Sequence, residues 1–365
     1  MPNGARGGVL SGSPVATGAE QIFGDLRAVA ARVRADLEAE IAESSLELPA
    51  DVAPAVEISR FAREERARVL EAGVSGLEKL AAHREDEIDE DESFGVEAIV
   101  LLQGRPAILV QRQDFAPQRD EWAVLDGQRA AIRESLSRVG RVEVTGHPSL
   151  DWIGTAFLVG PRAVMTNRHV ASEFSRFEAD RDRWTFEFGM SARVDPAEEL
   201  PVDGAPVAAA SSSPYEITEI IGIHPDVDMA LLRIEPSASD GLPTPLAVAA
   251  DAPASVPGRP VYVVGYPAWD GRRNEPESMR RIFMDVYNVK RLQPGAATEF
   301  TPGSLVMKHD CSTLGGNSGS PVLDLTDHRV LGLHFGGRYR SGNLAVPLWE
   351  LVDDPLLARA EVNWV

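Results

Sequence analysis

From Gly140 to about Pro347, short β-prone runs follow one another at close intervals, with turn residues between them. R-V-E-V-T is followed by W-I-G-T-A-F-L-V, then by the turn G-P-R and by A-V-M-T-N. W-T-F-E-F, Y-E-I-T-E-I-I-G-I and D-M-A-L-L-R-I come later. Many short strands at this spacing are typical of a β-barrel or a β-sandwich. We therefore expect this part of the chain to be mostly β.

A second series of strand-like runs follows residues 236–258, a linker rich in Pro, Ala and Ser. It reads P-V-Y-V-V-G-Y-P, I-F-M-D-V-Y-N-V, S-L-V-M-K-H-D, P-V-L-D-L, R-V-L-G-L-H-F and L-A-V-P-L. The apolar residues after Pro347 predict a short closing helix. We therefore predict one domain over residues 140–365, with one β unit at about 140–235 and another at about 259–352.

The beginning of the chain has a different pattern. Residues 1–18 are rich in Gly, Ser, Pro and Ala and are expected to be disordered. Residues 19–84 are expected to form a helical arm or hairpin, because apolar residues recur every three or four positions. The first apolar stripe consists of Ile22, Leu26, Val29, Val33, Leu37 and Ile41. Gly73 and Gly76 are expected to break or bend the second helix.

Residues 85–139 are expected to form an acidic linker followed by a small β-hairpin and a helix. Residues 85–92 read E-D-E-I-D-E-D-E, and a run of this charge is predicted to be a solvated spacer. The β-prone runs 96–102 and 106–111 are joined by Q-G-R, which predicts the hairpin. Residues 127–139 carry the pattern of a helix.

Charge and composition narrow the classes of partner. The formal net charge of −20 argues against a nucleic-acid partner and against an anionic membrane surface. Cys311 is the single cysteine, so no disulfide can form within the chain. No long apolar run follows a basic start, so we expect no signal peptide. No window of about 18 apolar residues predicts a membrane span. The expected location is cytoplasmic.

Residues 311–322, C-S-T-L-G-G-N-S-G-S-P-V, carry the main chemical signal. A serine hydroxyl is a poor nucleophile unless a base removes its proton and hydrogen-bond donors hold the oxyanion that follows. The glycines let the backbone turn sharply and let a substrate carbonyl approach main-chain N–H groups. The alternative is a glycine–serine turn between two strands. A histidine and an aspartate upstream, in suitable contexts, would decide between the two.

The run G-N-S-G-S-P resembles the nucleophile loop of chymotrypsin-fold serine proteases, and S-T-L-G-G-N-S-G-S-P-V looks closest to that of bacterial glutamyl endopeptidases. Two further motifs extend the resemblance over about residues 140–352. W-I-G-T-A-F-L-V-G-P-R-A-V-M-T-N-R-H-V is similar to the family's histidine hairpin, and D-M-A-L-L is similar to its aspartate strand. The resemblance implies two six-stranded antiparallel β-barrels of chymotrypsin type with a cleft between them. Here an α-helical N-terminal extension would precede them.

The resemblance also implies a catalytic triad. Among seven histidines, His169 would be the general base, Asp228 would orient it, and Ser318 would be the nucleophile. Asp226 is the alternative candidate for the aspartate that orients His169. We favour Asp228, because the apolar run begins directly after Asp228. The order of the three residues is that of chymotrypsin. The backbone N–H groups of Gly316 and Ser318 would form the oxyanion hole.

A second set of residues matches positions that hold the substrate's glutamate in glutamyl endopeptidases. Ser312 stands where trypsin-like enzymes carry an aspartate for basic side chains, so specificity for Arg or Lys is disfavoured. Thr313 and His334 can donate hydrogen bonds to a carboxylate. The alternative for His334 is a buried strand histidine with a satisfied partner. An extended substrate strand would also pair with Phe335, Gly336 and Gly337.

The leading hypothesis is an intracellular serine endopeptidase that cleaves after Glu, and less readily after Asp, under the control of its N-terminal extension. Its substrate would be a protein or peptide, and the N-terminal helices could bind a regulatory protein. No cofactor and no metal are expected. The alternative is a catalytically silent protease-fold scaffold that binds protein partners. Residues 85–92 also offer glutamates for self-cleavage, although a charged spacer is the simpler interpretation.

Overall fold

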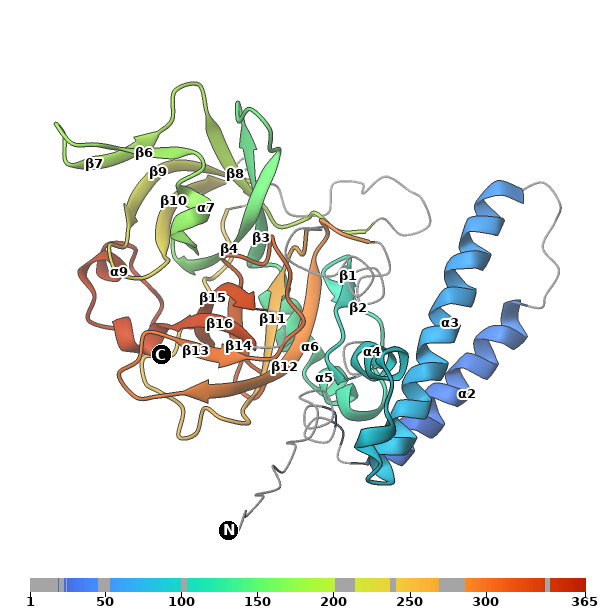
Figure 1. Ribbon diagram of the computed structural model, residues 1–365. Helices are drawn as coiled ribbons and strands as arrows, with labels where there is room; N and C mark the ends of the chain where they lie inside the picture. The colour runs from blue at the N-terminus through green and yellow to red at the C-terminus, as the bar shows by residue number, and fades with distance from the viewer. Residues whose placement is uncertain are drawn as a thin grey trace, which may run out of the picture. The chain divides into compact units, whose positions relative to one another are not determined.

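The computed structural model describes residues 19, 23, 25–44, 53–99, 104–200, 214–236, 241–268, 286–338 and 342–365. The chain divides into two compact units, Met1–Gly104 and Arg105–Val365. Helices build the first unit, and strands dominate the second (Figure 1). Among the described helices, none combines the length and the apolar character that a membrane span requires. The stretch 1–18 that we expected to be disordered lies outside the described residues.

The first unit consists of α2 (Leu26–Ser44), α3 (Ala53–Ala81) and α4 (Glu90–Ile99), with a short 3-10 helix, η2 (Glu85–Glu87). The predicted helical hairpin is present, since α2 and α3 share one apolar core. The predicted stripe is confirmed where the structure describes it, because its buried members include Leu26, Val29, Val33 and Leu37.

We expected Gly73 and Gly76 to break or bend the second helix, but α3 is continuous through both glycines. A Cβ atom on Gly73 would fall on the backbone carbonyl of Gly95, and a Cβ atom on Gly76 would lie 2.6 Å from Val96 Cγ2. The glycines therefore let α3 and α4 approach closely while α3 stays continuous. The prediction of a break was wrong because a glycine is tolerated inside a helix, and here both glycines have a packing role against α4.

The acidic run does not form the solvated spacer that we predicted. Its first part forms η2 and its last residues begin α4. Glu92 is buried and accepts hydrogen bonds from Ser75 Oγ and Lys79 Nζ, both at 2.6 Å. Burial raises the pKa of Glu92, but these bonds and that of the Asp89 N–H outweigh it, so the pKa is lowered. The run is thus folded, and half-buried Lys79 pairs with Glu92, while Asp86, Glu87, Asp89 and Asp91 are exposed.

The predicted hairpin over residues 96–111 is also wrong in its first half. Residues 96–99 belong to α4, where Val96 and Ile99 are buried in the helical core. Residues 106–111 do contain a strand, β1 (Ile108–Gln111). It pairs with β2 (Asp114–Phe115) and with a strand of the second barrel, β12 (Arg291–Phe300). Residues 96–99 are helical because they pack in the helical core, whereas residues 108–111 form a strand because they pair with β2 and β12.

The second unit holds the two predicted six-stranded antiparallel barrels. The first is closed in the order β10-β5-β4-β3-β8-β9. Its strands are β3 (Val139–Thr145), β4 (Trp152–Gly160), β5 (Ala163–Thr166), β8 (Ser191–Asp195), β9 (Tyr215–Ile223) and β10 (Ala230–Pro236). A hairpin of β6 (Ser175–Glu178) and β7 (Arg183–Phe186) projects from this barrel (Figure 1).

The second barrel runs β11-β14-β15-β16-β13-β12 and closes through the β11–β12 pairing. Its strands besides β12 are β11 (Pro260–Gly265), β13 (Met307–His309), β14 (Pro321–Asp324), β15 (Val330–Arg338) and β16 (Gly342–Pro347). We had missed β12, because Pro294 and Gly295 inside it are turn residues by sequence. The expected closing helix is present as η5 (Leu348–Leu351) and α9 (Pro355–Arg359).

Residues between β2 and β3 join the two barrels. They form η4 (Asp120–Trp122), α5 (Val124–Gly127) and α6 (Arg129–Leu136). Leu125, Ile132 and Leu136 are fully buried in one core with Phe157 of the first barrel and Tyr262 of the second. These residues therefore belong with the barrels, although we had predicted that the β domain begins at residue 140.

Lys290 lies at the point where these parts meet. Its Nζ donates to Gln113 Oε1 at 3.0 Å, to the Leu136 carbonyl at 2.8 Å and to the Pro196 carbonyl at 2.5 Å. The side chain is fully buried, and Glu199 lies 4.0 Å away. Burial lowers the pKa of Lys290 to about 7, while the charges of Glu199 and Asp195 oppose this shift. One amine thus connects the β1–β2 turn, the end of α6 and the segment after β8.

Candidate active site

His169 lies in α7 (Arg168–Ala171), a single turn that follows β5. Its Nδ1 is 2.7 Å from Asp228 Oδ2, and its backbone N–H donates to Asp228 Oδ1 at 3.0 Å. Burial raises the pKa of Asp228, but the hydrogen bonds and the charge of His169 together lower it by more, so the pKa lies below its ordinary value. Asp228 therefore stays ionised and can hold one imidazole tautomer.

The neighbouring Asp226 does not reach His169. Its backbone N–H donates to His224 Nδ1 at 3.0 Å, and its side chain is exposed. His224 Nε2 is 3.1 Å from Asp354 Oδ2, so this histidine ties the turn before β10 to the start of α9. The structure thus brings Asp228, rather than Asp226, to His169. We had not predicted the support from His224.

The loop that carries Ser318 is bound to the first barrel through Thr155 of β4. The Thr155 N–H donates to the Ser318 carbonyl and Thr155 Oγ1 donates to the Gly316 carbonyl, both at 2.8 Å. Gly319 has a φ of +89°, and a Cβ atom there would collide with the Thr155 carbonyl. Glycine is therefore required at this position by both space and backbone conformation. Thr155 is not among the functional residues that the sequence motifs indicated.

Ser318 lies next to the helix turn of His169. A Cβ atom on Gly154 would lie 2.8 Å from Val170 Cγ2 and 2.9 Å from the Ser318 carbonyl oxygen. The space at Gly154 between Val170, the residue after His169, and the Ser318 carbonyl is thus too small for a methyl group. The close approach brings the two sides of the predicted site together across the barrels.

Two N–H groups of the serine loop are available for a ligand. Both carbonyls that could turn toward the site, those of Gly316 and Ser318, are bound by Thr155. Within the part of the chain that the structure describes, the N–H groups of Gly316 and Ser318 donate to no protein acceptor. A pair of free N–H donors beside a serine can stabilise an oxyanion.

His334, one residue of the predicted specificity site, is paired with a second buried histidine. His334 Nδ1 lies 3.1 Å from His309 Nε2, and the two rings meet edge to face. Burial lowers the pKa of His309 to about 3. Burial, and then the charges of His309 and His169, lower the pKa of His334 well below its usual value. Both rings are therefore neutral near neutral pH, and His309 is a partner that we had not predicted.

The other predicted pocket residues differ in their freedom to bind a substrate. The Ser312 hydroxyl donates to the Arg105 carbonyl at 2.6 Å, so it already has an acceptor. Thr313, Phe335 and Gly336 are half-buried, and Gly337 is exposed. Thr313 has no hydrogen bond to another described residue. Thr313 and His334 are thus the two predicted donors that remain available.

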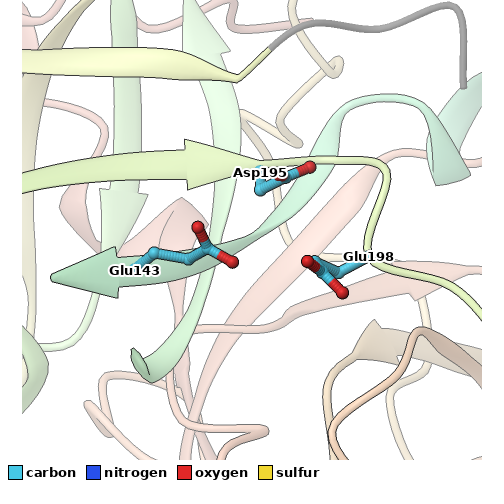
Figure 2. Close-up of side chains that lie close together, drawn as sticks. All are labelled: Glu143, Asp195 and Glu198. Carbon is cyan, nitrogen blue, oxygen red and sulfur yellow. The ribbon is translucent and has the colours of Figure 1, made fainter. Parts of the chain in front are cut away.

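Arginines pair with two of the three carboxylates in a cluster at the first barrel. Oxygens of Glu143, Asp195 and Glu198 lie within 4.8 Å of one another (Figure 2). Arg141 Nη2 is 2.5 Å from Glu143 and 3.1 Å from Glu198, and Arg193 Nη2 is 2.6 Å from Glu143. Burial first, and then Asp195 and Glu143, raise the pKa of Glu198. The arginines thus pair with Glu143 and Glu198, while Asp195 Oδ1 accepts a hydrogen bond from the Ala197 N–H at 2.8 Å.

Residues 154–333 match the family model of the trypsin-like peptidase domain. No curated protein matches the chain. The active form of the Rv3671c protease from M. tuberculosis is 21% identical with a TM-score of 0.42, over 70% of this chain and 91% of that chain. Its inactive form is 22% identical with a TM-score of 0.39, over 66% and 96%.

A solved Glu endopeptidase in complex with MPD is also similar, with 15% identity and a TM-score of 0.38 over 58% of this chain and 85% of that chain. At these identities and TM-scores, neither neighbour bears on the activity of this chain. The family match rests on the stretch that runs from β4 to the middle of β15 and includes His169, Asp228 and Ser318.

The buried histidine pair predicts a loss of stability in acid. Unfolding would restore both imidazoles to a pKa near 6.5, so below that pH the unfolded chain binds more protons than the folded chain. The free energy of unfolding should fall between pH 6.5 and 4.5 by up to about 1.4 kcal/mol per pH unit for each histidine. His309→Gln should make this dependence less steep.

Urea unfolding followed by tryptophan fluorescence measures this dependence, since all six tryptophans lie after residue 105. The slope against pH is the readout, because the substitution also changes the absolute stability. An unchanged slope in the variant would show that the pair is not neutral in the folded protein.

Proposed function

Because this chain carries a trypsin-like peptidase domain and is a serine peptidase of the chymotrypsin type, we propose that it hydrolyses peptide bonds through Ser318, His169 and Asp228. The observation that carries the assignment is the bond of 2.7 Å between His169 Nδ1 and Asp228 Oδ2, beside a serine loop with two free N–H groups. No other described histidine has a carboxylate partner next to this loop. We infer a protein or peptide substrate for this site.

In this mechanism the Ser318 hydroxyl attacks the carbonyl carbon, and His169 Nε2 accepts its proton. Asp228 accepts the Nδ1 hydrogen and stabilises the imidazolium that forms. The N–H groups of Gly316 and Ser318 donate to the oxyanion. His169 then gives its proton to the leaving amine, which leaves an acyl-enzyme. A water deprotonated by His169 attacks the ester, and Ser318 is restored.

Replacement of the nucleophile tests this assignment. Ser318→Ala should lower kcat at least roughly 10⁴-fold, because no other group can form the acyl-enzyme. A fluorophosphonate should label the wild-type chain at Ser318, as intact mass would show, and should not label the variant. Ser255→Ala removes an exposed hydroxyl far along the chain from the site and serves as the control. Undiminished hydrolysis by Ser318→Ala would reject the triad.

A folded wild-type chain that neither hydrolyses peptides nor reacts with the fluorophosphonate would favour the second candidate, a silent scaffold that binds proteins. The proposed triad is complete in residue type, which weighs against that candidate.

For substrate choice, we propose cleavage after Glu, with Asp weaker. His334 cannot attract an anion as a cation, since its pKa is lowered far below neutral pH. It can act as a neutral donor if His309 Nε2–H donates to its Nδ1, because its own proton then lies on Nε2. The Thr313 hydroxyl would be a second donor. The acceptor-only carboxylate of glutamate fits such a pair of donors.

Paired peptides that end in Glu or Gln before the scissile bond test this choice. Wild type should prefer Glu, and His334→Gln should lower kcat/KM for the Glu peptide about tenfold to a hundredfold, as for the loss of a hydrogen bond to a charged group. The Gln peptide should be affected much less. Equal losses for both peptides would mean that His334 supports the fold only.

We also propose that the helical unit regulates the peptidase by binding a protein partner or by restraining the site. Its own apolar core and its internal Lys79–Glu92 ion pair support an independent module. A cytoplasmic location stays a prediction.

Gly73→Leu in the full chain tests this regulation, because the new side chain would collide with Gly95 and separate α3 from α4. We expect kcat/KM to change at least about threefold, with loss of helical circular dichroism as the check that the packing has been disrupted. Unchanged kcat/KM together with the lost helical signal would remove regulation by this unit from the proposal.

A further inference from the structure

Residues 310–313 form one wall of the proposed specificity pocket, and Arg105, which precedes both barrels, is bonded to this wall. Ser312 lies six residues before Ser318, and its hydroxyl donates to the Arg105 carbonyl at 2.6 Å. The Ser312 carbonyl accepts a hydrogen bond from Gln293 Nε2 of β12. The hydroxyl and the carbonyl of Ser312 are therefore bound by other parts of the protein rather than free for a substrate.

Arg105 also binds this wall through its side chain. Its Nη2 donates to Asp310 Oδ2 at 2.6 Å, and the other carboxylate oxygen, Oδ1, accepts from the Ala296 N–H at 2.7 Å. The side chains of Arg105 and Asp310 are 13% and 27% exposed, so the ion pair is shielded from solvent. A charge-assisted bond in such a place is stronger than a surface pair. Arg105 thus holds the residue two before Ser312 and, through its carbonyl, Ser312 itself.

The backbone around Arg105 is fixed from the other side. Arg291 is fully buried, and its Nη1 donates to the Ala107 carbonyl at 2.7 Å. One residue further, Ile108 pairs with Leu292 of β12. The segment that carries Arg105 therefore cannot move away from Ser312 without breaking bonds to the second barrel.

We infer that Arg105 is a positioning residue for substrate selection: it fixes residues 310–313, which form the wall beside the substrate's acidic side chain. The inference rests on the proposed function of that pocket. Arg105 touches no reacting atom, so it acts through Asp310 and Ser312. Loss of a contact that binds the substrate side chain equally in the ground state and the transition state raises KM and leaves kcat unchanged.

The test compares Arg105→Ala with Arg105→Lys and with Arg119→Ala, whose arginine is exposed. With a peptide that ends in Glu before the scissile bond, Arg105→Ala should raise KM about tenfold and leave kcat within about twofold. Arg105→Lys keeps a cation for Asp310 and should recover at least half of the lost affinity. Arg119→Ala should behave like wild type. Tryptophan fluorescence confirms that each variant is folded.

A double variant distinguishes positioning from general weakening. If the Arg105–Asp310 bond carries the effect, Asp310→Asn should raise KM similarly, and Arg105→Ala should add less than about twofold to it. Wild-type KM in folded Arg105→Ala, or losses that simply multiply in the double variant, would overturn the inference. If wild type prefers a residue other than Glu, the glutamate proposal fails, and the same KM comparison is made with the preferred peptide.

Discussion

The fold of the second unit depends on a buried amine that has to be satisfied by three separate parts of the chain. Lys290 donates to the β1–β2 turn, to the end of α6 and to the segment after β8. An ammonium carries three donors, and leaving any of them unpaired in an interior costs a large part of its solvation energy. The residues before β3 are therefore required by the barrels, because without them the Lys290 amine would lose two of its three acceptors.

The proposed catalytic groups depend on the same junction. His169 and Asp228 belong to the first barrel, whereas Ser318 belongs to the second, and Thr155 connects the two through bonds to the carbonyls of Gly316 and Ser318. Those bonds turn the carbonyls toward the first barrel and leave the N–H groups of the loop free. Relative displacement of the barrels would thus disturb the base, the nucleophile and the oxyanion donors together. The large inter-barrel core resists such displacement.

Sequence patterns were informative where local chemistry and burial agree. The strands around His169 and Asp228 alternate with clear turns, so the strands could be predicted from the pattern, while the roles of the two residues came from the resemblance of their motifs. The patterns misled where a distant partner reversed the local preference. Glu92 reads as part of a charged spacer but is buried beside Lys79. Pro294 and Gly295 read as a turn but lie inside β12, where β11 supplies the pairing. His309 gave no signal, because only a closed barrel brings inward side chains of the non-adjacent strands β13 and β15 together.

The sequence by itself determined the mostly β class of residues 140–365, which follows from the spacing of short strand-like runs. The two-barrel arrangement and the three residues proposed for the triad came from the resemblance of three short motifs to chymotrypsin-fold proteases. Only the tertiary structure decided how those residues are supported. It brought His309 within hydrogen-bond distance of His334 and the Ser312 hydroxyl to the Arg105 carbonyl. It also joined the residues from 105 onward to the barrels. The physical reason is that hydrogen-bond satisfaction in an interior is a property of three-dimensional neighbours. Residues more than 200 positions apart, such as Arg105 and Ser312, leave no local trace of that pairing.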